Sequence, residues 1–163
     1  MSDVYDAQIQ SAADKFLKYD WRIYKAQLIA ESNLDPEAVS PVGAVGLAQF
    51  MPGTWADVLK NRGLPLDLKR TDPEAAIECG AWYMRSLCEQ WSSKRPLMDR
   101  VCLAMASYNA GLGNVLKAQK LADNANLYAP IIAELPGVTG KNSKETINYV
   151  KKILDLYNKM VTG

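Results

Sequence analysis

The sequence contains no histidine, and its three cysteines, Cys79, Cys88 and Cys102, form no CxxC pair. Without histidine the chain cannot build the serine and cysteine hydrolase triads that use imidazole, nor use imidazole as a general base. The same absences disfavour a zinc site, because such sites are built mostly from cysteine and histidine. Acid–base chemistry therefore falls to Glu, Asp, Lys or Tyr, and we expect no metal and no other cofactor.

An excess of charge and long apolar runs are also missing. The 19 basic residues nearly balance the 18 acidic ones, and the net charge of +1 disfavours nucleic acid as a partner. No stretch reaches the length of a membrane span, so we expect no stable membrane insertion. Residues 1–6 lack the basic and apolar regions of a secretory signal peptide, and the sequence predicts no export route of its own.

What the sequence does contain is typical of a mainly α-helical fold. Its 163 residues, 48% hydrophobic and 23% charged, fit one globular domain over 1–163, and no repeat or low-complexity linker divides them. Periodicity and Gly, Pro and Asn punctuation predict helices over about 3–18, 21–32, 54–62, 72–91, 97–109, 114–122 and 143–161. The helix from Asp72 carries an apolar stripe that should be core: Ile77, Gly80, Ala81, Met84, Leu87, Cys88 and Trp91. On this stripe Cys88 is interpreted as a small buried hydrophobe rather than a reactive thiol.

One glutamate stands out by its neighbours. Glu31 lies three residues after Leu28 and seven after Tyr24, and so shares an apolar helix face with them. A carboxyl held against such a face has its charged form disfavoured, so its pKa should rise and it can remain protonated near neutrality, as a general acid requires. The alternative is a helix-end glutamate that reaches solvent. Residues 40–52 follow, with two glycines separated by two residues, which indicate unusual turns or an ordinary connecting loop.

Three blocks together resemble the signature of the soluble lytic transglycosylase family. The first is Glu31-Ser32 followed by residues 36–54, PEAVSPVGAVGLAQFMPGT. The second is residues 107–115, SYNAGLGNV, and the third is residues 145–150, ETINYV. The resemblance implies a lysozyme-like, mainly α-helical single-domain fold with a substrate cleft. It also implies cleavage of peptidoglycan glycan strands between N-acetylmuramic acid and N-acetylglucosamine.

The resemblance implies roles for individual residues as well. Glu31 would be the single catalytic acid and base. The residues that would contact the glycan are Ser40, Gln49, Met51, Tyr108, Asn109, Glu145 and Tyr149. Structural alternatives exist for three of them, with Tyr108 as a core residue, Met51 as a gap filler and Asn109 as a helix-end cap.

Most glycosidases use two carboxylates, whereas the family pattern supplies only one here. Asp35, Glu37 and Asp57 lie nearby in sequence but match no family position for a second acid, and Asp35 is a candidate helix N-cap. The implied mechanism is substrate-assisted, with protonated Glu31 giving its proton to the glycosidic oxygen while the sugar's N-acetyl oxygen stabilises C1. The C6 hydroxyl of the same sugar then attacks C1 and leaves a 1,6-anhydromuramic acid end.

Two other functions are alternatives. A muramidase of the goose type would share the fold and the glutamate but let water attack the same bond. A non-catalytic peptidoglycan-binding module of a phage tail or secretion apparatus would bind without turnover. A compact catalytic domain without a signal peptide is similar to a bacteriophage endolysin, and a fragment cut from a longer bacterial or virion protein would look the same. We therefore expect a monomer, made in the host cytoplasm and released by a holin to act on the cell wall.

Overall fold

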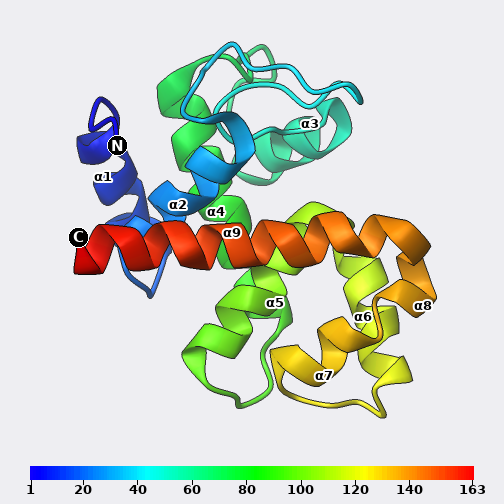
Figure 1. Cartoon of the computed structure of the whole chain (residues 1–163). Helices are drawn as coiled ribbons and strands as arrows, with labels where there is room; N and C mark the ends of the chain where they lie inside the picture. Colours follow the sequence, from blue (N-terminus) through cyan, green and yellow to red (C-terminus); the bar gives the residue numbers. More distant parts are fainter. The chain divides into compact units, whose positions relative to one another are not determined.

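The computed structural model describes residues 1–163, which form nine α-helices and one 3₁₀ helix (Figure 1). The α-helices are α1 (Asp6–Phe16), α2 (Trp21–Ser32), α3 (Pro52–Asn61), α4 (Pro73–Gln90), α5 (Leu97–Ala110), α6 (Leu112–Leu121), α7 (Tyr128–Ala133), α8 (Pro136–Thr139) and α9 (Ser143–Thr162). The 3₁₀ helix covers Gly140–Asn142. Extended pairing is limited to isolated bridges from Val45 to Val39 and to Phe50. The predicted mainly α-helical fold is confirmed.

Local signals explain most helix ends. The Asp20 carboxylate accepts from Arg22 N at 2.9 Å at the start of α2, and the Asp72 carboxylate accepts from Ala75 N at 3.0 Å at the start of α4. Helix α3 begins at Pro52, two residues before the predicted start, because proline is pre-organised for the first helical position. The predicted cap at Asp35 is wrong, since its carboxylate accepts from Glu37 N at 2.9 Å in a turn that no helix follows.

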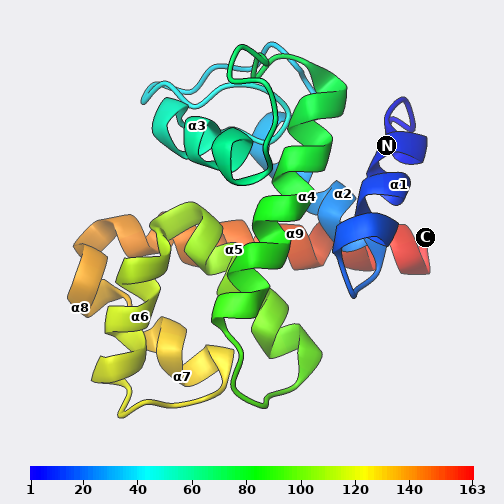
Figure 2. The same cartoon turned by 180° about the vertical axis from the view of Figure 1, so that it is seen from behind.

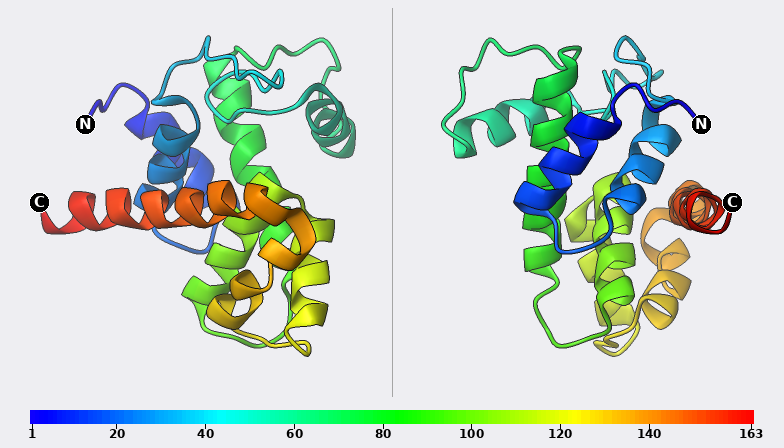
Figure 3. Two further views of the ribbon diagram at one scale, coloured as in Figure 1. Left: turned by 45° about the vertical axis from the view of Figure 1, so that its right-hand side comes forward. Right: turned by 90° about the vertical axis from the view of Figure 1, so that its left-hand side faces the viewer.

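Contacts group the chain into two compact parts, a first part of residues 1–83 and 156–163 and a second part of residues 84–155. In the first part α1 packs beside α2 (Figure 3). Lys25, whose side chain is 6% exposed, pairs with Asp6 at 2.6 Å and fixes this contact. The core of this part contains Ile9, Tyr24, Leu28, Leu47, Leu59 and Ile77. The expected single domain over 1–163 stays a prediction.

In the second part α6 packs on α5, α7 and α8, and α7 also contacts α5 (Figure 2). Its core includes Leu103, Met105, Ile131, Leu135 and Ile153. The Trp91 indole donates to the Ser107 hydroxyl at 2.9 Å, so a polar pair is satisfied inside this core. The helices α7 and α8 and the 3₁₀ helix were not predicted, because they are short and carry no periodic apolar stripe.

The predicted stripe of α4 is buried except at Cys88, which is only half-buried. Burial still raises the pKa of the Cys88 thiol to about 11, which fits the interpretation that it is not a reactive group. Cys79, which lies off the stripe, is fully buried. None of the helices combines the length and the apolar character needed to cross a bilayer.

Candidate functional site

Glu31 lies in the last turn of α2 and is half-buried. The apolar face predicted beside it is present, since Tyr24 and Leu28 are each 1% exposed. Immediately after it the chain turns sharply, because Asn33 and Leu34 both adopt left-handed backbone angles, with φ of 53° and 60°. Left-handed residues other than glycine store strain and often lie at functional sites. The glutamate is therefore neither a core residue nor a freely exposed helix end.

The segment 39–51, called the glycine-rich loop, is tied to α2 at Ser32. The Ser32 hydroxyl lies 2.9 Å from Leu47 O and 3.1 Å from Leu28 O and shares its hydrogen between these two carbonyls. Ser32 is buried, so its bonds are not weakened by competition with water. The residue next to Glu31 thus fixes the distance between the glutamate's helix and the loop.

Two predicted site residues of the loop also build its turns. The Ser40 hydroxyl accepts from Ala44 N at 3.0 Å. The Gln49 amide nitrogen donates to Ala38 O at 3.1 Å and to Gly46 O at 3.0 Å, and Gln49 itself has a left-handed φ of 50°. Because the amide nitrogen of Gln49 is used by the loop, a contact with a ligand falls to its carbonyl oxygen.

Met51 is the last residue of the loop and directly precedes α3. Its side chain is 41% exposed, so the gap-filler alternative is wrong. An exposed methionine offers a soft apolar contact to a ligand. Ser40, Gln49 and Met51 therefore all lie on one loop that is bound to the end of α2.

A buried tyrosine, Tyr24, lies on α2 seven residues before Glu31. The Tyr24 hydroxyl donates to Ile77 O of α4 at 2.7 Å, and it fits there only because residue 80 is glycine, where a Cβ would overlap the hydroxyl oxygen. Burial raises the pKa of Tyr24 well above its usual range, and electrostatic interactions with Cys79 and Glu31 add to the rise. Tyr24 is therefore a neutral donor at physiological pH.

The second part holds the other four predicted site residues. The Asn109 amide is fixed by α9, since its oxygen accepts from the Thr146 hydroxyl at 2.7 Å and its nitrogen donates to the exposed Glu145 at 3.4 Å. Asn109 lies inside α5, which ends at Ala110, so the helix-cap alternative is wrong. Tyr108 is half-buried, and Tyr149, one turn after Glu145, is 9% exposed.

The structure thus places the predicted residues in two groups. The first group, Glu31 with Ser40, Gln49 and Met51, belongs to the first part, and the group around Asn109 belongs to the second part. Sequence reasoning assigned no role to Ser32 or Thr146, although both lie within the quoted blocks. Arg70, which contacts the glycine-rich loop, lies outside every block, and no pattern in the sequence indicated a role for it.

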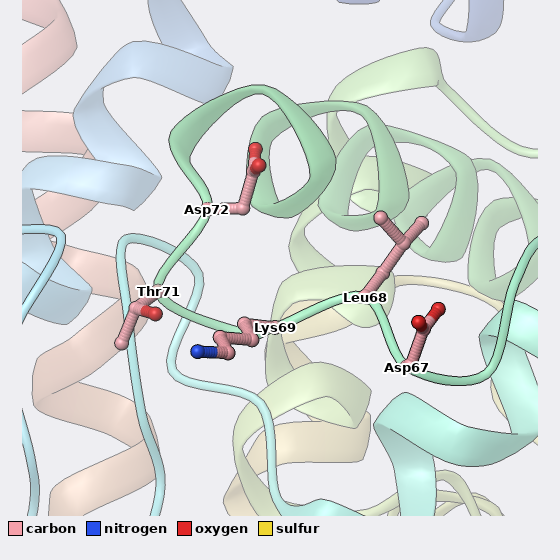
Figure 4. Close-up of a pocket in the computed structure, with 5 residues that line it drawn as sticks. All are labelled: Asp67, Leu68, Lys69, Thr71 and Asp72. Atoms are coloured by element: carbon pink, nitrogen blue, oxygen red, sulfur yellow. The ribbon is translucent and has the colours of Figure 1, made fainter.

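A depression of about 400 Å³ lies on the segment between α3 and α4 (Figure 4). It is lined by Asp67, Leu68, Lys69, Thr71 and Asp72. None of the predicted site residues lines it, so it does not mark the candidate site. No three His, Cys, Asp or Glu side chains are grouped where they could hold a metal ion.

Comparison with known proteins agrees with these observations. A membrane-bound lytic murein transglycosylase F of Maricaulis maris is 36% identical over 119 residues, which cover 73% of this chain and 24% of that protein. The 70-kDa soluble lytic transglycosylase of Escherichia coli superposes with a TM-score of 0.78 at 25% identity, covering 99% of this chain and 25% of the other. An inactive mutant of the lytic transglycosylase Slt of Pseudomonas aeruginosa gives 0.76 at 26% identity, covering 98% and 24%.

The chain spans about a quarter of the length of these relatives. Within that span the fold is shared from end to end, which confirms the lysozyme-like helical fold. The profile of the transglycosylase SLT domain matches residues 8–129, a range that includes Glu31, the glycine-rich loop and Asn109. The chain therefore belongs to the transglycosylase SLT domain family.

Proposed function

We propose that the chain is a lytic transglycosylase that cleaves peptidoglycan glycan strands between N-acetylmuramic acid and N-acetylglucosamine, with Glu31 as its acid and base. The observation that carries the proposal is the position of Glu31, half-buried at the end of α2 and bound through Ser32 to the glycine-rich loop. The family match supports it, because the matched relatives are named as lytic transglycosylases.

The proposed reaction has two stages. In the first, the protonated Glu31 gives its proton to the glycosidic oxygen, the C1–O bond breaks and the N-acetylglucosamine side leaves with a free hydroxyl. The N-acetyl oxygen of the muramic acid stabilises C1, which replaces the second carboxylate of ordinary glycosidases. In the second stage the Glu31 carboxylate takes the proton of the C6 hydroxyl, whose oxygen bonds to C1. The product is a 1,6-anhydromuramic acid end, no water is consumed and Glu31 is again protonated.

The other residues would bind and orient the glycan. The Gln49 carbonyl oxygen can accept from a sugar amide or hydroxyl, since the nitrogen of this amide is held by the loop. The exposed Met51 offers apolar contact. In the second part the tyrosine ring of Tyr108 would stack on a sugar face, and Asn109 with Glu145 would bind hydroxyl groups.

The decisive experiment compares muropeptides released from purified peptidoglycan by wild type and by Glu31→Gln, using mass spectrometry. We expect products lighter than the hydrolytic ones by one water from wild type, and none from Glu31→Gln. A matched control is Glu37→Gln, which changes an exposed glutamate six residues away and should keep the wild-type rate. Release by Glu31→Gln at the wild-type rate would refute the assignment.

The same experiment separates the alternatives. Reducible muramic acid ends from wild type would identify a goose-type muramidase, in which water takes the place of the C6 hydroxyl. Binding to cell walls with no release of soluble sugar would identify a binding module.

A role in host lysis is a more specific proposal than the cleavage of peptidoglycan. The endolysin assignment, its monomeric state and its holin-dependent release stay predictions, and two of the matching relatives are named as membrane-bound lytic murein transglycosylases. Expression of the chain with and without a holin, followed by culture turbidity, tests the lysis role. Lysis only with the holin is the expected result.

A further inference from the structure

The glycine-rich loop is hydrogen-bonded by a cationic side chain that lies outside the three sequence blocks of the family resemblance. Arg70 lies on residues 63–72, called the strap, which connect α3 to α4. Its Nη1 donates to Gly43 O at 2.9 Å and to Phe50 O at 2.8 Å. Charged donors make stronger hydrogen bonds than neutral ones, so these two bonds should contribute more than the neutral bonds within the loop.

The strap also meets the loop through its main chain. Gly46 has a φ of +87°, and a Cβ at this position would overlap the carbonyl oxygen of Arg70. Only glycine allows this approach together with this backbone angle. Phe50 O accepts a second bond from Val45 N at 3.1 Å, so the guanidinium binds where the loop closes on itself.

The strap is anchored on both sides of Arg70. The indole of Trp55, buried in α3, donates to Leu68 O at 2.8 Å, and Asp72 caps the start of α4. Figure 4 shows the strap running from Asp67 through Thr71 into α4 at Asp72. Because the backbone on both sides of Arg70 is already fixed, binding of the loop costs only the side-chain entropy of Arg70 and no further ordering of the strap.

We propose that Arg70 is a positioning residue for glycan binding, which holds the glycine-rich loop in the conformation that presents its binding side chains. The inference rests on the proposed function, because it takes Ser40, Gln49 and Met51 as contacts to the sugar. Arg70 acts through the loop and not on the reacting atoms. Without it the loop spends less time in the competent conformation, which lowers apparent affinity in proportion and leaves the rate at saturation nearly unchanged.

The test is steady-state kinetics of anhydro-product release from soluble, uncrosslinked glycan strands. Arg70→Met keeps the length of the side chain without its donors, and Arg70→Lys restores a charged donor. The matched control is Arg85→Met, at an exposed arginine of α4 that pairs with Glu89 at 2.9 Å. If the competent population falls to about a tenth, KM rises about tenfold in Arg70→Met while kcat stays within about twofold. Arg70→Lys should recover part of the loss, and Arg85→Met should behave as wild type.

A second measurement uses the protein without substrate. The amide of Val45 donates to Phe50 O within the loop, and that of Gly46 donates to Ala38 O just before the loop. Their hydrogen exchange should become faster in Arg70→Met while amides in the core of α5 stay protected. Where Arg70→Met does not fold, Arg70→Gln, which keeps a neutral donor, takes its place.

The two proposals fail in different ways. An unchanged KM and unchanged loop exchange in Arg70→Met, or a fall in kcat alone, overturns the role of Arg70 and leaves the wild-type reaction standing. Absence of anhydro products from wild type overturns the proposed function itself, and the glycan-binding role of Arg70 with it.

Discussion

The contact between Tyr24 and Gly80 makes a prediction that can be worked out in energy. Replacing Gly80 by alanine in the middle of a helix normally stabilises a protein by about 1 kcal/mol. Here the new Cβ would overlap the Tyr24 hydroxyl, which is buried and bonded to Ile77 O at 2.7 Å. Breaking that bond leaves a buried hydroxyl unsatisfied at a cost of about 1–3 kcal/mol, and overpacking costs a further 1–3 kcal/mol or so.

Gly80→Ala should therefore lower the free energy of unfolding by about 3 kcal/mol, after the gain in helix propensity is included. The cost should depend on a single oxygen atom. Once Tyr24→Phe removes that oxygen, the nearest atoms to the new Cβ are the Ala48 Cβ at 3.2 Å and the ring carbon Cζ at 3.4 Å, which a small shift accommodates. Tyr24→Phe alone should cost about 1 kcal/mol for its lost hydrogen bond.

The assay is urea unfolding of wild type, both single variants and the double variant, followed by circular dichroism. In the Tyr24→Phe background Gly80→Ala should cost about zero, so the coupling between the two sites is about 3 kcal/mol. Gly53→Ala is the matched control, because a Cβ at this helical glycine meets nothing within 4 Å and should be neutral or stabilising. Additive effects of the two substitutions, or a stabilising Gly80→Ala in wild type, would refute the reasoning.

Three further predictions concern the site and the cysteines. Ser32→Ala, which frees the glycine-rich loop from α2, should slow anhydro-product release about 10- to 100-fold and cost about 1 kcal/mol of stability in urea unfolding; an unchanged rate would contradict this role. Thr146→Val keeps the shape of a buried side chain but removes the hydroxyl that orients the Asn109 amide. The same assay should show slower release of anhydro products, and the free energy of unfolding should fall by about 1 kcal/mol. Burial raises the pKa of Cys88 and of Cys102 to about 11, so alkylation of the native protein, followed by mass spectrometry, should be slow at pH 8 and should accelerate as the pH rises toward that value. Rapid labelling of both thiols at pH 8 would show that burial does not suppress them.

Helix bounds and burial were predicted most accurately where local signals and hydrophobic periodicity agree. Helix α2 was predicted over its observed range of 21–32, and the structure shows Asp20 capping its start and Asn33 adopting the left-handed angle that ends it. The same periodicity placed Glu31 beside two buried residues, and the structure has them buried. Spacing alone therefore predicted the burial of the helix face that carries Glu31.

Periodicity was less informative about α4. It placed Cys88 in the core and left Cys79 undecided, whereas Cys79 is fully buried and Cys88 is half-buried. The reason is that α4 is covered on more than one face, and Cys79 lies within 3.5 Å of the Arg62 guanidinium on a side that the apolar stripe does not mark. A single stripe cannot predict burial on a helix with several neighbours.

The bonds that hold the site together were the least predictable, for a physical reason. Ser32, Gln49 and Arg70 all donate to main-chain carbonyls of the glycine-rich loop or its neighbours. Every residue carries a main-chain carbonyl, so the sequence does not show which carbonyl accepts a given hydrogen bond. Only the fold decides which carbonyl lies within reach of the donor.

The placement of strain explains why so many donors converge on this region. Asn33, Leu34 and Gln49 adopt left-handed angles close to Glu31 or within the loop, and such angles cost about 1–2 kcal/mol for each non-glycine residue. A loop with this cost would relax unless other bonds offset it. The Ser32 hydroxyl, the Gln49 amide and the Arg70 guanidinium each supply bonds of about 1 kcal/mol or more in the folded state. Because the cost of the backbone strain and the gain from these hydrogen bonds nearly balance, removal of any one donor should loosen the loop without unfolding the protein. Ligand binding should therefore weaken before global stability does.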